Sequence, residues 1–263
     1  MKKIFALVLA LLMCSFVFAS CVQKPSVVVG YTIYAPMNYK DENGNLVGFD
    51  TELAEAVFAR LGYNVVFKDI VWDNKYAELN AGTIDCIWNG FTANTADDDG
   101  VARADKVDFS YNYMLNKQVV VAKTELAATI TDMNSLNGKV GAGEKGSAGF
   151  AYIEKFAGAT KKECATQLDA LRDLTLGTVD FAVLDEQLAD SYIGKGEYTG
   201  IAKAEAVSSD SEYYAIGFKK GSELTAKVNE ALEALAKDGT ITAIAKKYGV
   251  EITAITDFAD QKK

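Results

Sequence analysis

Short apolar segments alternate with amphipathic segments along most of the chain. Residues 26–30 and 65–67 are continuous apolar runs rich in valine, which is typical of strands buried in a parallel sheet. Between them, residues 49–61 place apolar side chains on one helical face, with Asp50 expected as the N-cap and Gly62 as the stop. This order of strand, helix and strand predicts an α/β sheet with crossover connections.

The most informative stretch lies between residues 82 and 111. A helix is expected to end at Gly82, and the apolar run 84–88 is expected to form the next strand. That strand leads into the small polar turn 89–92, and the single arginine of this stretch, Arg103, comes later. A strand that ends in glycine and hydroxyl groups, followed by an arginine, is suited to binding a small anion.

The chain contains an internal match. Residues 78–90 (ELNAGTIDCIWNG) align without gaps to residues 173–185 (DLTLGTVDFAVLD). Each copy combines the end of a helix, a glycine stop and a strand, so the match predicts two lobes of similar construction. Because ligands of open α/β sheets bind beyond the carboxyl ends of strands, Gly90 and Asp185 are expected to face one crevice.

Two α/β domains joined by two crossing strands are therefore expected. The first lobe would comprise residues 26–118 and 217–256, and the second lobe residues 119–216. The hinge strands are expected at about 119–122 and 213–218, where extended apolar runs occur. Closure of the two lobes about this hinge is the expected motion.

The first twenty residues have the features of an export signal. Lys2 and Lys3 precede the apolar run 4–12, and small residues come directly before Cys21. This ending resembles the lipobox of bacterial lipoproteins, which implies cleavage before Cys21 and a diacylglycerol on its sulfur, with residues 21–25 as a tether. An ordinary signal peptide is the alternative, whereas a transmembrane anchor would need roughly 20 apolar residues.

The composition excludes several classes of function. The chain has no histidine, so a histidine triad and a histidine-ligated metal are excluded, and no metal or cofactor is expected. The formal charge of −9, or −11 without Lys2 and Lys3, makes nucleic acid an improbable partner and is read as an aid to solubility. Cys86 and Cys164 form no disulfide pattern and are read as unpaired structural thiols.

An ordered set of motifs spans residues 26–250. In order they are Tyr34-Ala-Pro36, Gly44-x-x-x-Gly48-Phe-Asp50, Trp72-Asp73, Leu79-x-x-Gly82-x-Ile-Asp85, Gly90-x-Thr92, Arg103-x-x-x-Val-Asp-Phe-Ser110-x-x-Tyr113, Leu136-x-Gly138-Lys-Val140, Gly146-Ser147, Gly177-x-Val-Asp180, Asp185, Asp238-Gly239 and Tyr248-Gly249. With these motifs the chain resembles the bacterial extracellular solute-binding proteins of family 3, the amino-acid-binding receptors of ABC importers. The resemblance implies the two-lobed periplasmic-binding-protein fold of type II.

The resemblance also implies a pocket for an L-amino acid. Tyr34 and Trp72 match the aromatic positions that enclose the aliphatic part of the ligand, although either ring could instead serve core packing. Gly90 matches the backbone acceptor for the α-ammonium, and Asp185 matches its counter-charge.

The α-carboxylate is expected to be shared between the lobes. Thr92 and Arg103 match its partners in the first lobe, and the arginine can form a fork that lysine cannot copy. The amides of Ser147 and Ala148, at a predicted helix start in the second lobe, favour the same group.

The side-chain subsite is expected at Glu144 and Asn89. A carboxylate at the position of Glu144 favours a cationic or amide side chain, so a polar or basic amino acid is expected; a surface glutamate is the alternative reading.

The segment before Arg103 departs from the family pattern. Relatives carry two residues between the position of Asn94 and the arginine, whereas eight separate them here, including Asp97 to Gly100. Arg103 is therefore assigned by counting back from Phe109-Ser110. The insert is read as a solvated loop; a Ca²⁺ loop is the alternative, but the ligand spacing of an EF-hand is absent.

The resemblance further implies a monomer that works with a membrane permease and an ATPase, exported and held by lipid to a bacterial membrane, facing the periplasm or the exterior. Two other functions stay open. Cyclohexadienyl dehydratases resemble the same family. An enzyme similar to a cyclohexadienyl or arogenate dehydratase would need a carboxylate such as Glu144 or Asp185 as its acid or base. A ligand sensor for a separate membrane receptor is the third reading.

Overall fold

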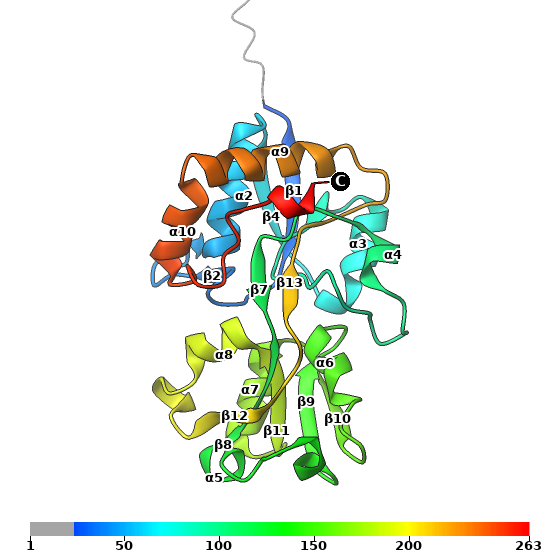
Figure 1. Ribbon diagram of the computed structural model, residues 1–263, viewed down its shortest axis with the longest axis vertical. Helices are drawn as coiled ribbons and strands as arrows, with labels where there is room; N and C mark the ends of the chain where they lie inside the picture. The colour runs from blue at the N-terminus through cyan, green and yellow to red at the C-terminus, as the bar shows by residue number, and fades with distance from the viewer. Residues whose placement is uncertain (1–23, 263) are drawn as a thin grey trace, which may run out of the picture.

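The computed structural model describes residues 24–262. In Figure 1 they form two lobes, one above the other, joined by extended strands. The expected signal, residues 1–20, and the expected lipid-bearing Cys21 lie outside the described residues. From residue 24 to residue 262, no helix combines the length and apolarity that a membrane span requires.

The first lobe contains a mixed five-stranded sheet in the order β4-β1-β5-β14-β6. Its strands are β1 (Ser26–Tyr31), β4 (Asn64–Asp69), β5 (Cys86–Ile87), β6 (Asp108–Phe109) and β14 (Gly217–Phe218). β1 pairs in parallel with β4 and β5, as crossover connections require, while β14 returns from the second lobe and pairs antiparallel with β5 and β6.

Helices cover this sheet. They are α2 (Phe49–Arg60), α3 (Lys75–Ala81), α4 (Arg103–Lys106), α9 (Leu224–Lys237) and α10 (Thr240–Tyr248), with the 3₁₀ turns η2 (Trp72–Asn74) and η5 (Ala259–Gln261) and a hairpin of β2 (Tyr39–Lys40) and β3 (Leu46–Val47). α2, α9 and α10 pack against one another (Figure 1), and the apolar face of α9, with Val228, Leu232 and Leu235, is buried there.

The second lobe is built around a second five-stranded sheet, in the order β10-β9-β11-β8-β12. Its strands are β8 (Gln118–Lys123), β9 (Val140–Glu144), β10 (Thr160–Cys164), β11 (Phe181–Asp185) and β12 (Ile201–Ser208). Its helices are α5 (Thr124–Ala127), α6 (Ala148–Ile153), α7 (Gln167–Leu176) and α8 (Glu186–Tyr192), with the 3₁₀ turns η3 (Met133–Leu136) and η4 (Gly196–Tyr198). Two α/β lobes, each with its own sheet, agree with the predicted fold class.

One of the two crossing strands lies at another position than expected, while the other, β13, overlaps the expected segment 213–218. β7 (Met114–Asn116) and β13 (Glu212–Tyr214) pair antiparallel between the lobes (Figure 1). The run 119–122, expected as a hinge, lies inside β8, which is flanked by β11 and β12 in the second sheet. Its valines are buried because they form the core of that sheet, and the same apolarity would be unfavourable in a segment between lobes.

The internal match corresponds to equivalent structure in both lobes. α3 and α7 each end at a glycine in the left-handed conformation, Gly82 with φ 72° and Gly177 with φ 74°. The aspartate that follows accepts a hydrogen bond from the backbone of the neighbouring strand in each lobe: Asp85 from Val28 N at 2.7 Å, and Asp180 from Val140 N at 2.8 Å. The interpretation of the match as two similarly built lobes is therefore confirmed.

Of three local expectations, two differ from the structure and one agrees with it. Asp50 is wrong as an N-cap, because α2 begins at Phe49 and no side chain caps it. The expected strand 84–88 is shorter, since only Cys86 and Ile87 join the sheet ladder. Cys86 and Cys164 are buried and unpaired, as predicted.

Candidate functional site

One small pocket lies between the lobes at the ends of the strands. Its cavity volume is only about 10 Å³, and it is lined by Trp72, Asn89, Gly90, Thr92 and Arg103 from the first lobe and by Glu144, Ser147, Ala148, Gln167 and Asp185 from the second. Nine of the ten ligand-binding residues named from the sequence are in this set, and Tyr34 is not. This volume is far below the roughly 300–1,000 Å³ of usual small-molecule sites, so the two lobes are closed on each other here and must move apart to admit a ligand.

Gly90 is held at the strand tip by Asp50. The Asp50 carboxylate accepts hydrogen bonds from Gly90 N at 2.8 Å and from the Tyr113 hydroxyl at 2.9 Å. Burial raises the pKa of Asp50 to about 7, against these hydrogen bonds, which lower it. Gly90 has φ 56°, and a Cβ there would lie 2.6 Å from the Tyr34 ring, so only glycine fits.

Asn89 braces the same turn from the inside of the lobe. Its amide donates to Thr32 O and to Asn38 Oδ1, both at 2.8 Å, and its oxygen accepts from the Thr32 hydroxyl at 2.6 Å. Both ends of the Asn89 amide are therefore already bonded to the protein. This residue lines the pocket but mainly fixes the turn that carries Gly90.

Arg103 is buried at the boundary of the two lobes. Its Nε donates to Asp97 Oδ1 at 2.7 Å, Nη1 to Thr92 O at 3.2 Å and Nη2 to Gly146 O of the second lobe at 3.3 Å. Its guanidinium also lies over the Phe91 ring, 5.2 Å from the ring centre. The acidic insert was expected to be a solvated loop. That interpretation is wrong for Asp97, which is buried against this arginine.

Thr92 contacts an acidic residue that was not expected in the site. Its hydroxyl donates to Glu212 Oε2 at 3.2 Å. The same oxygen accepts from Gln118 Nε2 at 2.9 Å and from Asn116 Nδ2 at 3.3 Å. Burial, followed by the nearby charge of Asp185, raises the pKa of Glu212 to about 7.

Asp185 is held by three amide side chains. Its Oδ1 accepts from Asn116 Nδ2 at 2.7 Å and from Gln118 Nε2 at 2.6 Å, and its Oδ2 accepts from Gln167 Nε2 at 2.5 Å. Burial raises the pKa of Asp185, while these hydrogen bonds oppose the rise. The carboxylate is thus fixed at the strand end but has no cationic partner among residues 24–262.

Glu144 lies at the end of β9 and faces the same pocket. It is buried, and its Oε1 has no hydrogen-bond partner in the described part of the chain. Burial, and then the charge of Asp185, raises its pKa from the usual 4.5 to about 8, although Lys75 acts in the opposite direction. The reading of Glu144 as an exposed surface residue is therefore excluded.

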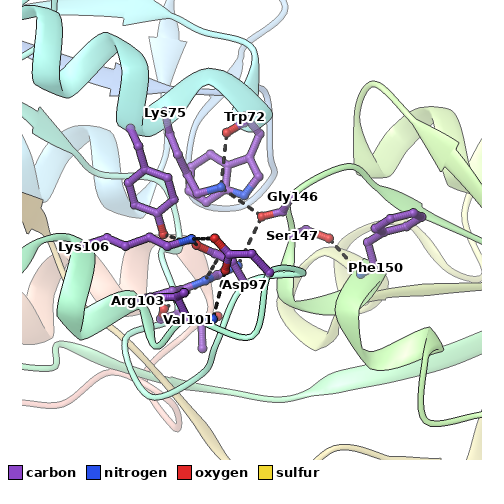
Figure 2. Close-up of polar contacts among 12 residues, drawn as sticks. Trp72, Lys75, Asp97, Val101, Arg103, Lys106, Gly146, Ser147 and Phe150 are labelled. Carbon is purple, nitrogen blue, oxygen red and sulfur yellow. Dashed lines mark hydrogen bonds and ion pairs between the residues drawn. The ribbon is translucent and has the colours of Figure 1, made fainter.

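The helix start in the second lobe is arranged differently from the expectation. Ser147 N donates to Glu144 O at 3.0 Å, so this amide is engaged within the turn, and the Ser147 hydroxyl caps α6 by accepting from Phe150 N (Figure 2). Of the two amides expected to bind a carboxylate, only that of Ala148, at the first position of α6, has no such contact within the turn.

Trp72 and Tyr34 have different environments. Trp72 lines the pocket, and the buried ammonium of Lys75 lies 5.0 Å from its ring centre. Lys75 Nζ also reaches across to Gly146 O at 3.0 Å (Figure 2). Tyr34 is buried beside Gly90, and its hydroxyl pairs with the Tyr214 hydroxyl at 2.6 Å. The expected aromatic sandwich is therefore present only on the Trp72 side.

Three residues of the site were missed. Gln167 comes shortly after β10, and it was missed because the lysines and glutamate of β10 are not typical of a strand. A signal was available, since Thr166 followed by Asp169 is the pattern of a helix N-cap. Glu212 is the first residue of β13 and lies directly before the predicted hinge run 213–218, so it was not considered as part of the pocket. Asp97 was one of three adjacent aspartates, and local pattern could not tell which one was turned inward.

The chain is similar to known proteins over most of its length. The family described as bacterial extracellular solute-binding proteins, family 3, matches residues 27–251. The L-cystine-binding protein TcyA of Bacillus subtilis (strain 168) is 30% identical over 235 residues, which cover 88% of this chain and 84% of that protein.

Two solved structures extend the likeness. An ancestral arginine-binding protein bound to arginine matches with a TM-score of 0.77 and 32% identity, covering 86% of this chain and 99% of that one. An ancestral amino-acid-binding protein described as a precursor of cyclohexadienyl dehydratase matches with a TM-score of 0.74 and 27% identity, covering 85% and 95%.

Proposed function

Because the chain belongs to the bacterial extracellular solute-binding proteins of family 3, we propose that it captures an L-amino acid with a polar or basic side chain and delivers it to the permease of an ABC importer. One observation carries the proposal: a single pocket is lined by a guanidinium from the first lobe, Arg103, and by a carboxylate from the second, Asp185. An α-amino acid carries the complementary pair of charges on two groups attached to the same carbon atom.

The proposed mechanism follows from this division of charges. In the open form, Arg103 and Thr92 take the α-carboxylate, and Gly90 offers its carbonyl to the ammonium. Closure brings Asp185 onto the ammonium, so only a ligand that carries both groups stabilises the closed form. Micromolar affinity corresponds to about −8 kcal/mol, which several charge-assisted hydrogen bonds can supply.

The proposed side-chain preference rests on Glu144. Its unpartnered, buried Oε1 is an acceptor that a ligand amide, imidazole or guanidinium would satisfy. An aliphatic side chain would leave that oxygen unpaired, and an acidic one would repel it, so both are disfavoured. Arginine binding by a relative with 32% identity is consistent with this preference.

A thermal-shift screen of the twenty amino acids against the described pocket tests the proposal. Stabilisation by polar or basic L-amino acids, followed by a measurable heat of binding in calorimetry, is the expected result. Stabilisation by branched or acidic amino acids alone would refute the side-chain preference. If no amino acid binds, the proposed function itself fails.

For attachment, we propose that residues 1–20 are removed and that Cys21 carries lipid, so that the chain is tethered to a bacterial membrane by residues 21–25. Labelling of growing cells with a fatty-acid analogue should mark the wild-type chain and leave Cys21→Ser unlabelled. Equal labelling of both proteins would contradict the lipid site.

A dehydratase is the second candidate. The likeness to the precursor of a cyclohexadienyl dehydratase favours it, together with Glu144, whose raised pKa of about 8 would keep it protonated and able to act as an acid at neutral pH. Turnover of prephenate or arogenate by the purified protein, lost in Glu144→Gln, would support the enzyme. Absence of product over many enzyme equivalents would leave binding as the function. A sensor role, by contrast, would require a separate membrane receptor.

A further inference from the structure

The acidic insert folds back as a short loop beside the pocket. Ala96 and Ala102 form an antiparallel bridge, and Arg103 N donates to Thr95 O at 3.0 Å. Asp97 N donates to Val101 O at 3.1 Å, which keeps the loop closed. The residue after the bridge, Arg103, therefore begins α4 in a position that the insert itself sets.

Within the insert, the three aspartates have different surroundings. The Asp97 side chain is only 9% exposed, whereas that of Asp99 is 56% exposed and bonds to Lys106 and to the loop backbone. Asp98 is exposed and forms no ion pair within residues 24–262. Only Asp97 faces the arginine of the pocket.

Both oxygens of Asp97 are engaged. Oδ1 accepts from Arg103 Nε at 2.7 Å, and Oδ2 accepts from Lys106 Nζ at 2.8 Å and from the Tyr76 hydroxyl at 2.6 Å (Figure 2 shows the carboxylate between Arg103 and Lys106). Although burial raises the pKa of Asp97, the charge of Arg103 and these hydrogen bonds outweigh it and lower the pKa. The carboxylate is therefore fixed, charged and pointed at Nε.

This contact decides which donors of Arg103 remain for a ligand. A guanidinium has five N–H groups. Asp97 takes the one on Nε, Thr92 O takes one on Nη1, and Gly146 O takes one on Nη2. One N–H is left on each terminal nitrogen, and these two donors remain for the oxygens of a carboxylate.

We propose that Asp97 is a positioning residue, which turns the Arg103 guanidinium so that its two terminal nitrogens face the pocket. That the ligand group is a carboxylate rests on the proposed function. The contact between Asp97 and Arg103 does not depend on it. The insert thereby supplies part of the binding site, because it carries the acceptor for Arg103 Nε.

Orientation and charge act in opposite directions here, which makes the proposal testable. The charge of Asp97 partly neutralises Arg103 and by itself weakens attraction for an anion. If charge were the only effect, every substitution that removes the charge of Asp97 would tighten binding. If orientation dominates, Asp97→Ala weakens binding, whereas Asp97→Asn, which keeps an oxygen acceptor for Nε, retains most of it.

The contact can be examined without any ligand by NMR of the arginine Nε–H groups. The sequence has three arginines, so the spectrum is simple, and Arg103→Lys assigns the relevant signal. We expect the Arg103 Nε–H to exchange slowly with water in the wild type and in Asp98→Ala, and to exchange rapidly in Asp97→Ala. Rapid exchange in the wild type would overturn the proposal, whatever the protein binds.

Binding is then measured by calorimetry on the wild type, Asp97→Ala, Asp97→Asn and the control Asp98→Ala. The probes are the amino acid with the largest thermal shift and its α-carboxamide, which keeps the ammonium and the side chain but has no negative charge.

For Asp97→Ala, we expect affinity for the amino acid to fall by about tenfold or more, in the range seen when partners of metal ligands are removed. Its affinity for the carboxamide, already weak, should stay unchanged, and Asp97→Asn should lie within about threefold of the wild type. Equal or tighter binding by Asp97→Ala, or an equal loss for both probes, would overturn the proposal.

If Asp97→Ala does not fold, Asp97→Asn decides the question. Slow exchange of the Arg103 Nε–H and retained affinity for the amino acid in this variant support the proposal, whereas rapid exchange and lost affinity refute it. If no amino acid binds the wild type, the proposed function fails, and the exchange measurement still decides whether Asp97 fixes Arg103.

Discussion

Replacing Glu144 by glutamine should stabilise the ligand-free protein and weaken its ligand binding. Glu144 is buried, one of its oxygens has no partner in the described chain, and its pKa is raised from 4.5 to about 8, mainly by burial. Glutamine has nearly the same shape but cannot ionise. The variant therefore removes the cost of keeping this group protonated in the folded state and leaves the packing of the pocket in place.

The sign and size follow from proton linkage. Between pH 4.5 and pH 8 the unfolded chain loses the Glu144 proton while the folded chain keeps it, so this group lowers stability as the pH rises. At roughly 1.4 kcal/mol per tenfold change in ionisation, the penalty is about 1 kcal/mol at pH 5 and about 4 kcal/mol at pH 8. For a domain of this size, each kcal/mol corresponds to about 2–4 °C in melting temperature.

Opening of the lobes limits the effect, because the open form returns Glu144 to water. If the wild type is mainly open, its melting temperature should differ less from that of Glu144→Gln. The two proteins should then differ more in radius of gyration. Calorimetric melting between pH 5 and pH 8 and small-angle scattering at pH 8 should be measured together, without ligand. Glu163→Gln, on the neighbouring strand β10 and 57% exposed, is the matched control.

We expect the melting advantage of Glu144→Gln over the wild type to grow with pH, or its radius of gyration at pH 8 to be smaller, while Glu163→Gln shows neither change. The same variant should bind a cationic amino acid more weakly, since a bound cation favours the ionised form of Glu144 and glutamine cannot ionise. A melting difference that is constant from pH 5 to pH 8, with no change in radius, would refute the reasoning.

Three further substitutions probe the rest of the pocket. Arg103→Lys keeps the charge but cannot form the fork, so affinity for the amino acid should fall about tenfold or more in calorimetry, with Arg60→Lys as the exposed control; unchanged affinity would count against the carboxylate role. Asp185→Asn removes the counter-charge of the ammonium and should abolish the binding heat, whereas Asp190→Asn, 57% exposed on α8, should not; a normal titration of Asp185→Asn would exclude that role. Gly90→Ala places a Cβ 2.6 Å from the Tyr34 ring at φ 56° and should lower both melting temperature and affinity, while Gly100→Ala, with open space around it, should lose only about 1–2 kcal/mol of backbone stability; equal effects would show that packing at Gly90 is not limiting.

Local sequence signals predicted the frame of this protein well. The glycine stops and the aspartates of the internal match form the same contacts in both lobes, because these contacts depend on residues a few positions apart and on an adjacent strand. The strand tips then bring Gly90 and Asp185 to one pocket, as the rule for parallel sheets requires.

Long-range partners could not be predicted in the same way. Asp50 has the sequence position of a helix cap, yet it accepts from Gly90, forty residues away. Glu212 reaches Thr92, which is 120 residues earlier in the chain. The first hinge strand was misplaced because an apolar run such as 119–122 has the same pattern whether it crosses between lobes or fills a sheet, and only the strand pairing distinguishes the two.

The residues between the lobes link the two ends of the pocket through one chain of hydrogen bonds. Asn116, at the end of the crossing strand β7, and Gln118, at the start of β8, each donate both to Asp185 and to Glu212. Glu212 in turn accepts from Thr92 of the first lobe. Two buried carboxylates that share donors resist being ionised together. Moving the lobes apart must lengthen some of these bonds, because Thr92 and Asp185 belong to different lobes. The group proposed to bind the carboxylate and the group proposed to bind the ammonium are therefore coupled through the hinge even before a ligand connects them.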